Sequence, residues 1–99
     1  MTHPWTASPL LVIGEAKLAM GDARGAIVPL QRARAIIEQQ PGDPPLRTPV
    51  LLALGKAMYA SGADRAQAVK LVEASRERMP PEALAETDAW LATARGTSR

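Results

Sequence analysis

The sequence predicts an all-α protein in which antiparallel helical hairpins are stacked side by side. Apolar residues recur every three or four positions along most of the chain, the period of an amphipathic helix, and no segment alternates as a half-buried strand does. A stretch that includes Gly14 and Gly21 also recurs in outline around Gly55 and Gly62. Repetition of a helix–turn–helix unit is typical of a solenoid, in which each unit packs on its neighbours.

Composition limits the size and the chemistry of this fold. The chain has 99 residues, enough for one domain with a modest core. Hydrophobic residues make up 46%, but there is no Phe and aromatic residues account for only 3%, so Ala, Leu, Ile, Val and Met must build the core. The absence of Cys excludes disulfides and thiolate metal sites.

The first helix is expected over residues 8–20, after an irregular lead-in of residues 1–7. Ser8 suits the N-cap position, and Pro9 suits the first helical position because its missing N–H would have no intrahelical acceptor there. The apolar face of this helix consists of Leu10, Leu11, Ile13, Leu18 and Ala19.

The second helix is expected over residues 23–40. Gly21 ends the first helix, and Asp22 can cap the second. Pro29 lies inside this segment, where we expect a slight bend because proline removes one backbone hydrogen bond. The apolar positions are Ile27, Leu30, Ala33, Ile36 and Ile37, and the Pro-rich stretch 41–45 ends the helix.

A second hairpin follows, with helices expected over 47–61 and 65–79. Thr48 and Pro49 repeat the capping signature, and the turn between the two helices contains Asp64, whose capping explains its presence. The apolar positions are Val50, Leu51, Leu54 and Met58 in one helix and Ala68, Leu71, Val72, Ser75 and Met79 in the other.

A fifth helix is expected over residues 81–95, followed by a flexible polar tail over 96–99. Pro80 breaks the preceding helix, and Pro81 suits the start of the next one. In this last helix Trp90, beside Leu91, is expected to belong to the core.

The two hairpins resemble tetratricopeptide repeats. That family has a Leu/Ile–Gly pair in its first helix, a Gly at the turn and small residues in its second helix. The matching positions are Ile13-Gly14 and Leu54-Gly55, Gly21 and Gly62, Ala26 and Ala68, and Ala33 and Ser75. The resemblance implies that small residues lie where two helix backbones cross closely.

The repeat length departs from the family's usual 34 residues, since Gly55 follows Gly14 by 41. This is nearer to the longer version, of roughly 42 residues, found in kinesin-light-chain-like and many bacterial signalling proteins. The resemblance therefore implies a tetratricopeptide-like domain over residues 8–95. Its parts are repeat one (8–40), repeat two (47–79) and a capping helix (81–95).

The resemblance also implies a function, that of an adaptor or scaffold module which binds a protein or peptide segment in a concave groove. The Ala-, Arg- and Pro-rich composition resembles repeats of large bacterial proteins, which favours a role in signalling or assembly. The groove positions carried over from the family are Leu11, Glu15, Leu18, Leu52, Lys56 and Tyr59, flanked by Ala19 and Ala60.

Three of these positions leave alternatives open. Glu15 and Lys56 are equivalent and opposite in charge, so they either read charge on a ligand or pair with each other, which contributes only about 0–1 kcal/mol. Tyr59 suits a binding hot spot, but it could equally pack on the next turn. Chaperone-tail binding is not expected, because the chain has no Asn for the family's carboxylate clamp.

Self-association is the alternative function. Two repeats are fewer than the three that usually make a stable stack. The uncapped first helix could therefore stack on a second copy and bury Leu10, Leu11 and Ile13. Trp5, just before this helix, could fold over the open end, anchor a partner or have neither role.

Other functions have less support in the sequence. We expect no enzyme activity, metal site or cofactor, because His3 is the only histidine and the chain has no phosphate-binding or nucleophile motif. A nucleic-acid-associated module is the weakest alternative, since the net charge is only +2 and Glu residues intersperse Arg32, Arg34, Arg76 and Arg78. No apolar run could span a membrane and no secretion signal is present, so we expect a cytoplasmic protein.

Overall fold

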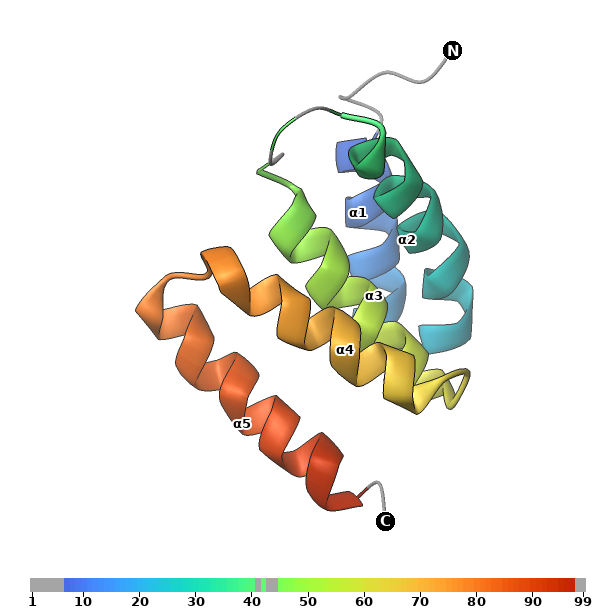
Figure 1. Ribbon diagram of the computed structural model, residues 1–99. Coiled ribbons are helices and arrows are strands. Elements are labelled where there is room, and N and C mark those ends of the chain that lie inside the picture. The colour runs from blue at the N-terminus through green and yellow to red at the C-terminus, as the bar shows by residue number, and fades with distance from the viewer. Residues whose placement is uncertain (1–6, 41, 43–44, 98–99) are drawn as a thin grey trace.

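The computed structural model describes residues 7–40, 42 and 45–97, and this part of the chain is helical without any strand. His3 and Trp5 lie outside the described residues. The helices follow one another in a row, with α1 and α2 at one end and α5 at the other (Figure 1). They are α1 (Ala7–Ala19), α2 (Ala23–Glu38), α3 (Arg47–Ser61), α4 (Arg65–Ser75) and α5 (Pro81–Thr97), and a short 3-10 helix, η2 (Arg76–Arg78), follows α4.

Most helix bounds agree with the sequence prediction, and the differences have local causes. The first helix begins at Ala7, so Ser8 lies inside it. Leu46 occupies the N-cap of α3 without a side-chain hydrogen bond, so the prediction of Thr48 as a cap was wrong. The predicted tail was wrong in part, because α5 continues to Thr97.

The fourth helix also ends earlier than predicted. It stops at Ser75, and the chain tightens into η2 before Met79 adopts an extended conformation. The residue before a proline is disfavoured in the helical region, and Met79 precedes Pro80. The helical path is therefore lost over the last turn rather than abruptly at Pro80.

The turns of the two hairpins are built alike. Gly21 and Gly62 have φ values of 86° and 76°, in the left-handed region that a side chain disfavours. After each glycine an aspartate caps the next helix: Asp22 accepts a hydrogen bond from the Gly25 N–H at 3.0 Å, and Asp64 accepts one from the Gln67 N–H at 3.1 Å. Both predicted caps are confirmed.

The helices of each hairpin also cross alike, at a glycine. A Cβ atom at Gly14 would overlap the side chain of Leu30 on α2. One at Gly55 would lie 2.6 Å from Cγ2 of Val72 and 2.9 Å from the carbonyl oxygen of Ala68, both on α4. The expected close approach at these glycines is confirmed, and at Gly55 it brings two backbones together.

The core lies where α3 packs against its neighbours. α3 contacts α1 and α2 on one side and α4 on the other, so it joins the two hairpins. The buried residues are aliphatic and small, as the composition predicts. The main cluster consists of Leu11, Ala26, Leu30, Ala33, Ile37, Val50, Leu51, Ala53, Leu54, Ala57 and Leu71.

The last helix is held against the second hairpin by a mixed set of contacts. Leu91 and Ala94 are buried, and the hydroxyl of Thr87 contacts the sulfur of Met79 at 3.2 Å. Two ion pairs join α5 to the segment before it, Arg76 with Asp88 and Arg95 with Glu73. α5 therefore closes one end of the row of helices.

Candidate functional site

Three predicted groove residues lie along one side of α3. Leu52, Lys56 and Tyr59 are spaced by four and three residues, so they share a helix face. All three are half-buried, as is Met58, whereas Ala53 to Gly55 and Ala57 are buried. The predicted face of α3 is thus its less buried side.

The predicted groove residues of α1 are placed differently from one another. Leu11 belongs to the core and is not open to a partner, so its prediction as a contact residue was wrong. Leu18 is half-buried against the same core, and Glu15 is exposed. Among the ion pairs of the described residues, none joins Glu15 to Lys56.

Tyr59 is engaged by α5. Its ring meets that of Trp90 edge to face, with the centroids 5.3 Å apart, and its hydroxyl donates a hydrogen bond to the Ala94 carbonyl at 3.0 Å. The guanidinium of Arg65 lies 4.8 Å from the ring centroid. The packing that the sequence left open for Tyr59 was on the next turn, whereas in the structure the ring packs on α5; its role in binding stays a prediction.

The outer side of α1 is apolar and open. Val12 is 61% exposed, Ile13 46% and Met20, just after the helix, 78%. Ala16 is exposed between them. We call Val12, Ile13, Ala16 and Met20 the outer face of α1.

This outer face differs in part from the surface predicted for self-association. Ile13 is common to both. Leu11 is already buried, and Leu10 is half-buried against the core. The exposed side of α1 is therefore displaced by about one residue from the side predicted for self-association. Val12 is an exposed position that the sequence did not predict.

The outer face of α1 has a buried counterpart in the second hairpin. With Gly14 matched to Gly55, the positions of Val12, Ile13 and Ala16 correspond to Ala53, Leu54 and Ala57 on α3. Those three are between 0% and 5% exposed, in the core that α3 shares with the first hairpin. The same helix face is thus covered in one hairpin and open in the other.

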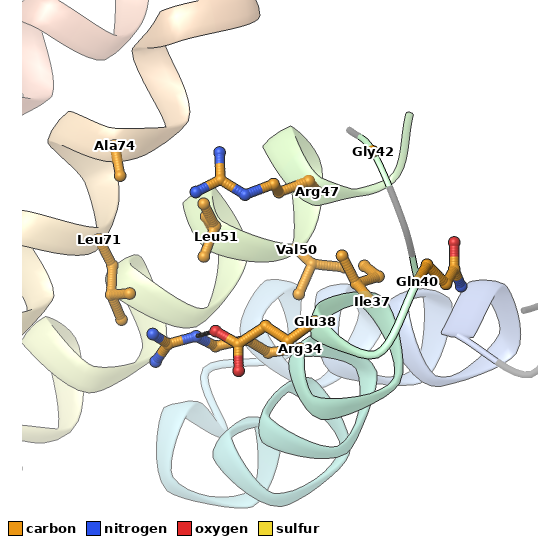
Figure 2. A pocket seen from close by; sticks show the side chains of 10 residues that line it. All are labelled: Arg34, Ile37, Glu38, Gln40, Gly42, Arg47, Val50, Leu51, Leu71 and Ala74. Carbon is orange, nitrogen blue, oxygen red and sulfur yellow. Dashed lines mark hydrogen bonds and ion pairs between the residues drawn. The ribbon is translucent and has the colours of Figure 1, made fainter. Parts of the chain in front are cut away.

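A cleft of about 290 Å³ lies between α2, α3 and α4 (Figure 2). Its buried floor is apolar and comes from three helices, with Ile37 on α2, Val50 and Leu51 on α3, and Leu71 on α4. Ala74 completes the wall on α4, and the cleft is partly open to solvent. The other lining residues are Arg34, Glu38, Gln40, Gly42 and Arg47.

Two arginines stand at the edge of this cleft. Nε of Arg34 donates to Oε2 of Glu38 at 3.1 Å along α2, and Nη1 of Arg47 lies 3.9 Å from Oε2 of Glu77. The view of Figure 2 draws the side chain of Leu51 between the two guanidinium groups. The cleft therefore combines an apolar floor with an edge at which two arginines are each paired with an exposed glutamate.

Sequence reasoning missed the cleft because its two halves carry different signals. Arg34 was read as part of a solvated, mixed-charge surface, and Ile37, Val50, Leu51 and Leu71 were read as core. Both readings hold for the individual side chains. Only the packing of α3 against both α2 and α4 brings the arginines and the apolar floor together.

The described residues contain no group of three or more His, Cys, Asp or Glu side chains placed to hold a metal ion. None of the helices in this part of the chain has the length and apolar character to cross a membrane. The candidate sites are thus the side of α3, the outer face of α1 and the cleft. Comparisons with protein-family models, with curated proteins and with solved structures found no match.

Proposed function

We propose that this domain is a protein-interaction module of tetratricopeptide-like build, and that the outer face of α1 receives a helical hairpin from a partner protein. One observation carries the proposal. Val12, Ile13 and Ala16 are exposed on α1, while their counterparts Ala53, Leu54 and Ala57 on α3 are buried.

The chemistry of the expected partner follows from what covers α3. That face packs against two antiparallel helices, α1 and α2, whose contributions to the core are Leu11, Ala26, Leu30, Ala33 and Ile37. A partner that fills the equivalent place on α1 would present a similar surface of aliphatic and small side chains. Repeat proteins stack through such nearest-neighbour contacts.

The composition of α1 also supports this role. Glu15 and Lys17 are its only charged residues, so apolar side chains run all round the helix. A helix that is apolar on every side is normally buried on every side. Among the described residues, the first helix of the row thus has an exposed apolar surface.

Self-association is the second candidate, favoured by the lack of charge on the outer face. Val12, Ile13, Ala16 and Met20 bring no like charges together when two copies meet. A molar mass near twice the 10.5 kDa of the chain, reached at low concentration, would support it. The predicted groove is a further proposal, now limited to Glu15, Leu52 and Lys56.

The test is affinity capture from a lysate of the source organism with the wild-type domain, Val12→Glu and Val28→Glu. Val28 is the matched control, since it is 57% exposed on α2 and receives the same substitution. We expect a partner protein that is captured by wild type and Val28→Glu and lost with Val12→Glu.

Circular dichroism should show all three proteins equally helical, because both substituted side chains are exposed. Capture of the same partner by Val12→Glu would contradict the assignment of the outer face. Recovery of only the domain itself, by wild type and Val28→Glu, would favour self-association.

A further inference from the structure

We infer that the cleft between α2, α3 and α4 is a second binding site, for an acidic peptide that inserts one large apolar side chain between flanking carboxylates. This goes beyond the function proposed above. None of the residues of the outer face of α1 lines the cleft, so the two sites can be tested separately.

The floor of the cleft determines the apolar part of the ligand. Ile37, Val50, Leu51 and Leu71 are each 5% exposed or less, and they leave about 290 Å³ of space above them. This is just below the range of roughly 300–1,000 Å³ typical of small-molecule pockets. The space suits a single inserted side chain better than a whole cofactor, which favours a peptide as the occupant.

The edge of the cleft determines the charge of the ligand. Among the described residues that line it, Arg34 and Arg47 are cationic and Glu38 is the one carboxylate, so these residues together have a net positive charge. An arginine has five N–H donors in a planar arrangement, and Arg34 uses the Nε–H in its hydrogen bond to Glu38. Its terminal nitrogens and those of Arg47 suit peptide carboxylates, which guanidinium groups bind in a bidentate manner.

A ligand can displace the two carboxylates, of Glu38 and Glu77, that pair with the arginines. The side chain of Glu38 is 60% exposed and that of Glu77 is 72% exposed, and exposed pairs of this kind contribute little to stability. The Arg47–Glu77 pair is also long, at 3.9 Å. An acidic peptide can therefore take over both arginines without leaving a buried charge unpaired.

The experiment is a titration of the 15N-labelled domain, followed by NMR. The probe is a pentapeptide with phenylalanine at its centre, glutamate on either side, glycine at each end and both termini blocked. We expect saturable shifts at the amides of Ile37, Leu51 and Leu71 and at the Nε–H signals of Arg34 and Arg47. The same peptide with glutamines in place of glutamates should bind about tenfold more weakly or not at all.

Two variants test the two parts of the site. Arg34→Gln/Arg47→Gln should weaken binding of the glutamate peptide by about tenfold, and the control Arg24→Gln/Arg32→Gln, with the same change in net charge on exposed positions of α2, should leave it unchanged. Ala74→Leu, which fills the cleft and keeps both arginines, should abolish binding. Each variant is first shown to be folded by its helical circular dichroism.

Several results would overturn the inference. Equal affinity for the glutamate and glutamine peptides would remove the role of the arginines, and full binding by Ala74→Leu would remove the cleft. Shifts that cluster elsewhere, or none at all, would do the same. Octanoate, with one carboxylate on an apolar chain, serves as a second probe. If it produced the expected shifts and the peptide produced none, the cleft would be a site for a small apolar anion instead of a peptide. Val12→Glu should bind the peptide as tightly as wild type does, whether or not the outer face of α1 proves to bind a hairpin.

Discussion

Val12 and Ala53 stand at the same position of two like-built hairpins, yet Val12 is 61% exposed and Ala53 only 5%. The difference does not come from the residue types, because valine is the more hydrophobic of the two. It comes from the neighbour: α3 follows a hairpin that covers it, and the structure has no such hairpin against the outer face of α1 among the described residues. The exposed apolar surface of α1 thus results from the position of this helix in the row.

The glycine crossing gives the first prediction. Gly55→Ala should destabilise the domain by about 1–3 kcal/mol, because the added methyl group meets a backbone carbonyl oxygen and a buried Val72 that cannot both move away. Gly96→Ala is the control, since a Cβ there meets nothing within 4 Å and alanine favours a helix. Urea denaturation of both variants checks this. Equal stability of the two would refute the close crossing.

The contact between Tyr59 and α5 gives the second prediction. Tyr59→Phe keeps the ring beside Trp90 but removes the hydrogen bond to the Ala94 carbonyl, at a cost of about 0.5–1.5 kcal/mol. Because this bond joins α3 to α5, amide hydrogen exchange should quicken in α5 more than in α2. If exchange in α5 were unaffected, Tyr59 would not be holding that helix.

The helix cap at the second turn gives the third prediction. Asp64→Ala should cost about 0.5–2 kcal/mol of stability, because the Gln67 N–H loses its acceptor at the start of α4. Asp64→Asn should retain most of the stability, since its side-chain oxygen can accept the same bond. Thermal melting of the pair distinguishes loss of the cap from loss of the charge: a similar loss in both would assign the effect to charge.

The elements of this fold were largely predictable because the signals that define them are local. Gly21 and Gly62 mark turns through their conformation, Asp22 and Asp64 mark the helix starts that they cap, and Pro81 begins α5. The predicted start of the third helix at residue 47 is confirmed, but Thr48 does not cap it because Arg47 is already helical.

The candidate sites were less predictable because they depend on which helix covers which. The resemblance supplied Leu52, Lys56 and Tyr59 as groove positions, and all three are half-buried along α3. It could not reveal that α5 would engage Tyr59, nor that Leu11 would face inward. The cleft is harder still, since its parts come from three helices and share no sequence pattern.

The proposal that the outer face of α1 binds a helical hairpin is tested most directly by adding a hairpin to the chain in front of α1. A chain in which residues 7–46 are duplicated in front of the original residue 7 gives α1 the neighbour that α3 already has. The account predicts one cooperative thermal transition and a gain of about 2–3 kcal/mol from burying Val12 and Ile13.

The matched control is the same extended chain with Val12→Glu in the original first helix, which should lose that gain. A melting temperature above that of the 99-residue chain, abolished by the control substitution, would support the account. An unchanged melting temperature, or two independent transitions, would contradict it.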